Sequence, residues 1–157
     1  MNIENLATLR DFLLTNDVPF HMDSWREDDE FLTKDIIDKG VAVCNTSGCA
    51  LGWAPFVIPA IDIDFYPYCD GVVGVDFREY SDRVFSLNRY EDSSVFDSDW
   101  TLIDNSREGA AFRINQLVNG VVYDYRDLKS GIEGHTKEYT QYVTDRDTWL
   151  LTKGITL

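Results

Sequence analysis

The chain has 157 residues, of which 44% are hydrophobic and 13% aromatic, so it holds enough apolar material for one folded domain and is not globally disordered. Its 28 acidic and 14 basic side chains give a formal net charge of -14, and such a surface repels nucleic-acid phosphates. We therefore predict a single globular domain over residues 1–157 that does not bind DNA or RNA directly.

The surplus of acidic side chains lies in the first two thirds of the chain. Residues 1–105 hold 21 acids and 7 bases, whereas residues 106–157 hold 7 of each. Two interpretations follow from this asymmetry. The acidic surface either only keeps the protein soluble, or it forms a face that attracts a basic protein surface.

The first predicted element is a helix over residues 3–14, with Asn2 as a suitable N-cap. Its apolar stripe at helical spacing consists of Ile3, Leu6, Leu9, Phe12 and Leu13. No glycine follows, so we expect the turn-forming residues from Asn16 to end it. The charged stretch 26–40 has apolar residues at rough helical spacing, and both a surface helix and an inserted loop remain open for it.

Residues 41–61 form the longest segment without charge. Its polar residues, glycines and prolines argue against a membrane-spanning helix, so we expect soluble core and no membrane contact. A short helix through Ala50, Leu51 and Trp53 is predicted to end at Pro55. The first residues lack the pattern of a secretory signal, and three sparse cysteines favour reduced thiols, so we expect a cytoplasmic protein.

The middle of the chain predicts a short strand or extended loop over residues 61–68 and a turn or hairpin between Gly71 and Gly74. A helix capped by Asp76 follows. Its core-facing residues are expected to be Phe77, Tyr80, Val84 and Leu87.

The last third predicts one clear helix over residues 107–119, capped by Ser106 and ended by a left-handed Gly120. The Val, Tyr, Thr and Trp content of residues 121–125 and 139–151 favours strands. Together these elements predict an α+β fold, in which helices dominate the first 120 residues and a small antiparallel sheet completes the domain.

Two aromatic and cysteine motifs stand close together in the first third, Phe20-His-Met22-Asp-Ser-Trp25 and Cys44-Asn-Thr46-Ser-Gly-Cys49-Ala-Leu-Gly52-Trp53. With these motifs the chain resembles a family of uncharacterised phage and prophage proteins, over about residues 3–119. The resemblance implies a phage origin, and hence the cytoplasm of the host, but no known activity.

Cys49 is the candidate nucleophile if the protein is an enzyme. A thiolate at a helix N-terminus is stabilised by the helix dipole, and the base would have to be His21 or His135. The alternative is a buried core thiol, because the following Ala-Leu-Gly-Trp sequence is apolar. Zinc would need Cys44, Cys49 and Cys69 together with an isolated histidine, so we expect no metal and no cofactor.

Acidic and tyrosine side chains are the candidate residues for binding a protein partner, because tyrosine offers contact area at low entropic cost. The alternative for the tyrosines is a core position with the hydroxyl reaching solvent. The candidates are Glu27, Asp28, Asp29, Glu30, Asp62, Asp64, Tyr66 and Tyr68.

Three functions compete on these observations. The first is a phage accessory protein that binds and modulates a host protein with a basic surface, as an anti-defence factor or inhibitor, with DNA mimicry as one variant. The second is a protein that sequesters a nucleotide signal. The third is a hydrolase or transferase centred on Cys49. The basic residues available for the second function are Arg107, Arg113, Arg126 and Lys129.

Overall fold

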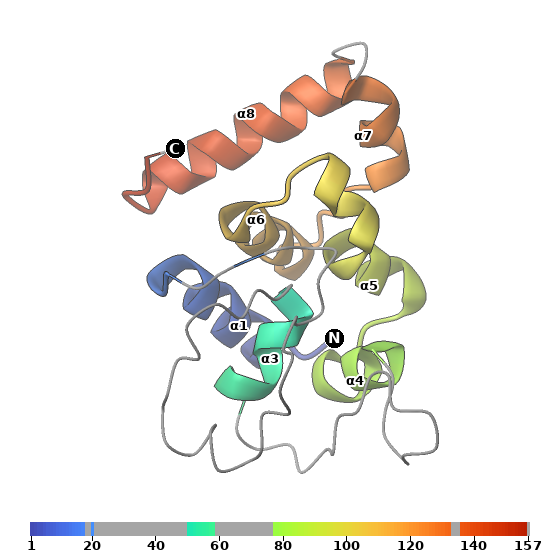
Figure 1. The fold of residues 1–157 in the computed structure, drawn as a ribbon, viewed down its shortest axis with the longest axis vertical. Helices are drawn as coiled ribbons and strands as arrows, with labels where there is room; N and C mark the ends of the chain where they lie inside the picture. Colours follow the sequence, from blue (N-terminus) through green and yellow to red (C-terminus); the bar gives the residue numbers. More distant parts are fainter. Residues whose placement is uncertain (18–19, 21–49, 59–76, 133–135, 157) are drawn as a thin grey trace, which may run out of the picture.

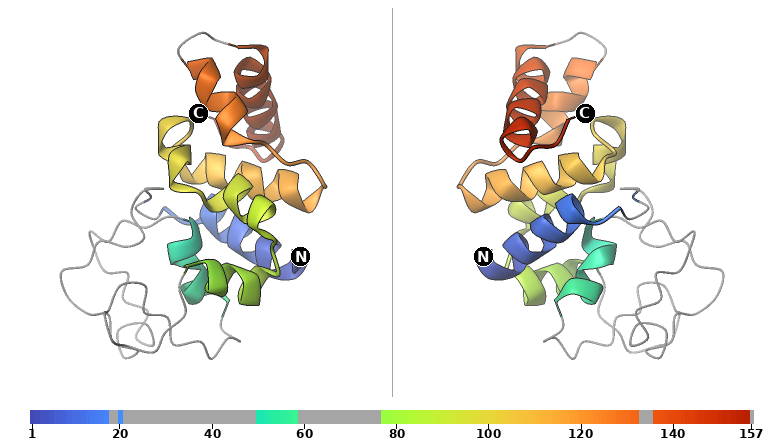
Figure 2. Two further views of the ribbon diagram at one scale, coloured as in Figure 1. Left: turned by 90° about the vertical axis from the view of Figure 1, so that its right-hand side faces the viewer. Right: turned by 90° about the vertical axis from the view of Figure 1, so that its left-hand side faces the viewer.

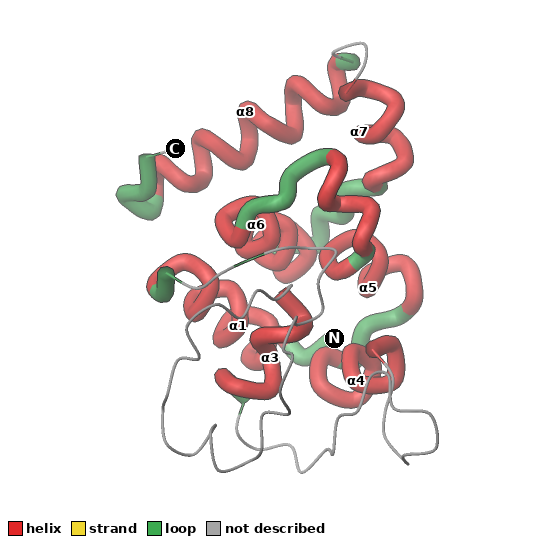
Figure 3. Tube along the Cα trace, viewed as in Figure 1, coloured by secondary structure: helices red, strands yellow, loops and turns green. Residues whose placement is uncertain are grey.

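The computed structural model describes residues 1–17, 20, 50–58, 77–132 and 136–156. Within these ranges the ordered elements are all helices, and Figure 3 shows no strand in them. The elements, labelled as in Figure 1, are α1 (Ile3–Thr15), α3 (Ala50–Val57), α4 (Phe77–Phe85), α5 (Arg89–Phe96), the 3-10 helix η1 (Ser98–Leu102), α6 (Arg107–Val118), α7 (Tyr125–Ile132) and α8 (Lys137–Thr152).

The α+β prediction is wrong for the part of the chain that the structure describes. Residues 121–124 form a loop that leads into α7, and residues 139–151 belong to α8. The side chains of α8 follow a helical rather than an alternating period, because Tyr142 and Leu150 are buried while Tyr139 and Trp149 pack partly buried against the core. Burial of one helical face has overridden the β-propensity of the individual residues. The predicted strand at 61–68 and the hairpin at 71–74 lie outside the described residues.

The prediction of a first helix is confirmed. The Asn2 side chain accepts a hydrogen bond from the backbone N–H of Asn5 at 3.2 Å, and the helix continues to Thr15. Leu6, Leu9 and Leu13 are fully buried, as the apolar stripe requires, although Ile3 at its first turn is 52% exposed.

The helix predicted over residues 107–119 is confirmed as α6, which lies at the centre of the described fold. Ser106 caps it, and Gly120 adopts a φ of 78°, the left-handed conformation that favours glycine. Ala110 and Ala111 are fully buried, and α6 makes its most extensive contact with α1.

The described part of the uncharged segment is core, as expected. Ala50, Leu51, Ala54 and Ile58 are buried, and the rings of Phe12 and Trp53 lie with centroids 6.1 Å apart. The predicted end at Pro55 is wrong, because α3 continues to Val57. A proline within a helix removes one backbone hydrogen bond and its ring crowds the preceding turn. Burial of Ala54 and Ile58 on either side of Pro55 acts against this cost.

The helix predicted around Tyr80 and Val84 is present as α4, and both side chains are buried. The sequence analysis did not predict α5, which begins after a capping box. The Asn88 side chain accepts from the backbone of Tyr90 and Glu91, and the Glu91 carboxylate accepts from the Asn88 backbone N–H at 3.0 Å.

The described helices are stacked along the long axis of the molecule. Helices α7 and α8 lie at one end, α6 crosses the middle, and α1, α3 and α4 lie at the other end (Figures 1 and 2). Helix α8 packs against α7 and α6. None of the helices in the described ranges is long and apolar enough to cross a membrane.

Candidate functional site

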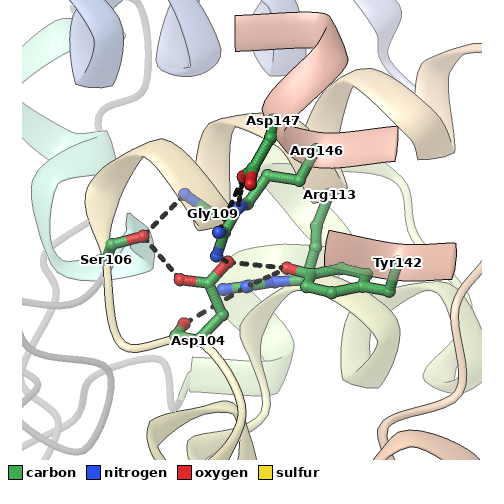
Figure 4. A network of polar contacts seen from close by, with 7 residues as sticks. All are labelled: Asp104, Ser106, Gly109, Arg113, Tyr142, Arg146 and Asp147. Carbon is green, nitrogen blue, oxygen red and sulfur yellow. Dashed lines mark hydrogen bonds and ion pairs between the residues drawn. The ribbon is translucent and has the colours of Figure 1, made fainter. Parts of the chain in front are cut away.

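A buried polar network joins the chain after η1 to α6 and α8 (Figure 4). At its centre is Asp104, which is 6% exposed. Its carboxylate accepts hydrogen bonds from the Tyr142 hydroxyl at 2.9 Å, Arg146 Nη1 at 2.8 Å and the Ser106 hydroxyl at 2.5 Å. Ser106 in turn accepts from the Gly109 backbone N–H at 2.9 Å, so the cap of α6 is part of the network.

Arg113 supplies a second positive charge inside the fold and is only 2% exposed. Its Nη1 donates to the Tyr142 hydroxyl oxygen at 3.2 Å and to the Asp104 carbonyl at 3.3 Å. The guanidinium carbon lies 4.2 Å from the centroid of the Trp100 ring, which is a cation–π arrangement. Nε and Nη2 find no acceptor in the described residues. The position of Arg113 is therefore fixed by Asp104, Tyr142 and Trp100.

Electrostatics keep this network ionised. Burial alone would raise the pKa of Asp104, but Arg113, Arg146 and the Ser106 hydroxyl together lower it below its ordinary value. Burial raises the pKa of Tyr142, so this hydroxyl stays protonated and donates to Asp104. The Asp104 carboxylate is buried, and three side-chain donors bind its two oxygens. The network is thus a structural connection between α6 and α8, in which the Asp104 carboxylate is hydrogen-bonded and the two nitrogens of Arg113 without an acceptor in the described residues are buried.

An open cavity of about 200 Å³ lies between α5 and the start of α7. Helix α5 contributes Arg89, Tyr90, Ser93 and Ser94 to its wall. The opposite wall is formed by the segment that enters α7, with Tyr123, Asp124, Tyr125 and Arg126.

The two sides of this cavity are positioned by helix caps. Asn88 caps α5, of which Arg89 is the first residue. The Asp124 carboxylate accepts from the Arg126 backbone N–H at 2.9 Å at the start of α7. Tyr123 donates to Asp145 at 3.1 Å, and burial together with this bond raises the pKa of Tyr123 to about 12. The cavity walls are therefore held by local hydrogen bonds and do not depend on a ligand.

A second cavity, of about 470 Å³, lies between α4 and α5. Three carboxylates line it together with two arginines, so its wall is of mixed charge. One of them, Asp92, is partly buried, and burial raises its pKa although Ser81 and Arg78 act in the opposite direction. The lining residues are Arg78, Glu79, Asp82, Leu87, Asn88, Arg89 and Asp92.

The four basic residues predicted for a ligand site do not lie together. Arg113 is enclosed in the network, and Arg107 forms ion pairs with two carboxylates at the start of α6. Lys129 Nζ lies 3.7 Å from a carboxylate oxygen of Asp99. Arg126 lines the 200 Å³ cavity, with its guanidinium carbon 5.4 Å from the centroid of the Tyr125 ring.

The other candidate residues lie outside the part of the chain that the structure describes. These are Cys49, His21 and His135 for catalysis, the cysteines Cys44 and Cys69, and Glu27, Asp28, Asp29, Glu30, Asp62, Asp64, Tyr66 and Tyr68 for partner binding. Among the described residues, no group of three or more metal-ligating side chains is close enough to hold an ion.

Sequence reasoning missed both the network and the cavity. A signal for the network exists, because Arg113 interrupts the buried face of α6 three residues after Ala110 and so demands a buried acidic partner. The tyrosines of the cavity carry no comparable signal, since Tyr90 and Tyr123 come together only through the packing of α5 beside the loop before α7.

Comparison with known proteins identifies no family model, no curated protein and no solved structure that matches this chain. The resemblance to phage and prophage proteins therefore stays a prediction, and the function has to be argued from the residues themselves.

Proposed function

We propose that the protein is a phage-type accessory factor that binds and modulates a host protein through an acidic surface. The observation that carries this proposal is that several arginine side chains of the described residues form ion pairs with nearby carboxylates. Arg83 pairs with Glu79, Arg107 with Asp17 and Glu108, and Arg146 with Asp104 and Asp147. Several of these pairs lie at the surface, and each base is taken up by acids close to it. Because the chain has 28 acids and 14 bases, a surplus of carboxylates remains.

Some carboxylates of the described surface form no ion pair with a described base. Glu4, Asp82 and Glu138 are exposed, and none of them forms an ion pair with a described residue. Exposed charges of one sign create a field that extends over roughly 8–10 Å at physiological salt and accelerates encounter with a surface of opposite charge. Such a field suits a partner with a basic surface, including one whose groove normally binds nucleic-acid phosphates.

The test is capture of a partner by the full-length protein, compared between charge variants. The first variant replaces the acidic run with neutral isosteres, as Glu27→Gln, Asp28→Asn, Asp29→Asn and Glu30→Gln. The matched control neutralises carboxylates that already pair with a base, as Asp11→Asn, Asp17→Asn and Asp99→Asn. We expect a stoichiometric complex that the first variant loses and the control largely retains.

Salt provides the second readout. An interaction held by surface charge weakens strongly between about 50 mM and about 500 mM salt, because counterions screen it. A complex with a partner that lacks a basic surface, or one whose affinity is independent of salt, contradicts the proposal. So does the absence of any stoichiometric complex at low salt.

A further inference from the structure

We propose that the cavity between α5 and the start of α7 binds a nucleoside monophosphate, with the phosphate held by Arg89 and Arg126 and the base placed against tyrosine rings. This inference does not depend on the acidic surface proposed above. It rests on the charge, shape and aromatic content of one cavity of about 200 Å³.

The charge of the cavity is opposite to that of the molecule. The net charge of the chain is -14, yet two arginines are among the residues that line this one small space. Neither Arg89 nor Arg126 forms an ion pair with a carboxylate in the described part of the chain, unlike Arg83, Arg107 and Arg146. Two like charges beside one cavity repel each other, and a phosphate between them would relieve that repulsion and accept hydrogen bonds from both.

One carboxylate, that of Asp124, also lines the cavity, but it already caps α7. Asp124 accepts the backbone N–H of Arg126 at 2.9 Å as the cap of α7. With Arg89 and Arg126 against this single acid, the formal charge of the lining remains positive. The larger cavity between α4 and α5 differs in this respect, because three carboxylates line it against two arginines, and we do not assign an anion to it.

Tyrosine rings supply the second part of the site. Tyr90 is 56% exposed although it is large and apolar over most of its surface, and it stands at the cavity wall. Tyr125 lies beside Arg126, and its ring contacts the buried Trp100 edge-on at a centroid distance of 6.4 Å, which fixes its orientation. Exposed and fixed aromatic rings beside a basic group are the features with which proteins stack bases while holding the backbone phosphate.

The size of the cavity limits the ligand. Pockets that enclose drug-sized molecules usually measure roughly 300–1,000 Å³. A space of about 200 Å³ lies below that range and opens to solvent, so a nucleoside monophosphate would be enclosed only in part, and a dinucleotide is not expected there. Ser93 also lines the cavity on the α5 side, and within this proposal its hydroxyl is assigned to the sugar.

The experiment is isothermal titration of the full-length protein with adenosine 5′-monophosphate, and separately with adenosine and with inorganic phosphate. The variants are Arg89→Gln and Arg126→Gln, with Arg83→Gln as the matched control on α4. We expect saturable binding of the monophosphate, at least about tenfold tighter than either fragment, because each fragment loses one half of the contacts. Each cavity variant should weaken it by about tenfold or more, and the control should not.

Any of the following results overturns the proposal. If the monophosphate does not saturate the protein, or if Arg89→Gln and Arg126→Gln bind as tightly as Arg83→Gln, the cavity is not the site. If adenosine binds as tightly as its monophosphate, the arginines do not hold a phosphate; if phosphate alone binds as tightly, the tyrosines do not hold a base. Circular dichroism of each variant excludes loss of folding as the cause. Partner capture is measured separately, so failure here leaves the proposed function untouched.

Discussion

The Tyr142 hydroxyl on α8 donates a hydrogen bond to the Asp104 carboxylate at 2.9 Å, and so connects two residues 38 positions apart in the sequence. The same hydroxyl oxygen accepts from Arg113 at 3.2 Å. Tyr142 thus lies between the buried acid and the buried base, and Phe112 and Tyr123 contact its ring edge-on. The hydroxyl and the ring together make this side chain the main link between α8 and the centre of the fold.

Replacing Tyr142 with Phe tests the polar half of that link. The ring packing is kept, but Arg113 loses an acceptor and Asp104 loses a donor in a buried setting. We expect the free energy of unfolding to fall by about 1–3 kcal/mol. Urea denaturation followed by tryptophan fluorescence measures it, and Tyr90→Phe at an exposed position is the control, expected to change stability by less than about 0.5 kcal/mol. Equal losses of stability in the two variants would contradict the stabilising role of the Tyr142 hydroxyl.

Asp104→Asn tests the ion pairs and predicts a dependence on pH. The folded-state pKa of Asp104 is lowered, so its ionised form stabilises the fold above the ordinary carboxyl pKa of about 3.9, and this contribution is lost as pH falls further, through the folded-state pKa. Near pH 7 the variant should lose about 3–5 kcal/mol, because the buried Arg113 keeps its charge without an ionised carboxylate beside it, although Arg146 retains Asp147.

The difference in stability between wild type and Asp104→Asn should then narrow as the pH is lowered below about 4. Urea titrations at several pH values give both curves. A difference that stays constant over this range would show that shape alone, and not charge, determines the effect of the substitution. Asp82→Asn, at an exposed position without an ion pair among the described residues, serves as the control.

Gly109→Ala should destabilise the protein even though it lies within a helix. Alanine is normally favoured over glycine there by about 1 kcal/mol. A Cβ at this position, however, would overlap with the Asp104 carboxylate, which packs directly against the backbone of α6. We expect a lower melting temperature for Gly109→Ala.

A double-mutant cycle identifies the cause of that loss. In an Asp104→Ala background the overlapping carboxylate is gone, so Gly109→Ala should cost much less than in the wild type or even stabilise the protein. If Gly109→Ala costs the same in both backgrounds, the overlap with Asp104 is not responsible.

Asp92→Asn should stabilise the protein near neutral pH. Burial raises the pKa of Asp92 in the folded state, so the ionised carboxylate opposes folding and wild-type stability declines as the pH rises above the ordinary carboxyl range. The neutral amide avoids this cost. Thermal melts should show a higher melting temperature for the variant at about pH 7, and no difference well below about pH 4. A variant that is less stable than wild type at neutral pH would contradict this account.

Helices with clear caps and a continuous apolar stripe could be predicted from the sequence. Residues 3–14 and 107–119 carry both signals, and the structure places α1 and α6 there. The cap that Asn88 provides for α5 is an equally local signal. The helix that follows it has only eight residues and a weak apolar stripe, so the sequence alone did not predict it.

The C-terminal third shows why propensity misled the prediction. Residues 139–151 are rich in side chains that favour strands, yet Tyr142, Arg146 and Leu150 recur at intervals of four residues on the buried side of α8. Periodicity, and not composition, decides the element in such a case. The cavity could not be predicted, because its two walls are separated by more than 25 positions and meet only through tertiary packing.

The network around Asp104 constrains how relatives of this protein can vary. An aliphatic residue in place of Arg113 would leave Asp104 with excess negative charge, and an aliphatic residue in place of Asp104 would leave two cations enclosed beside each other. Single replacements at these positions should therefore be rare, and loss of Arg113 should coincide with loss of Asp104. Paired replacement at positions 104, 113, 142 and 146 is the evolutionary signature to expect among homologues.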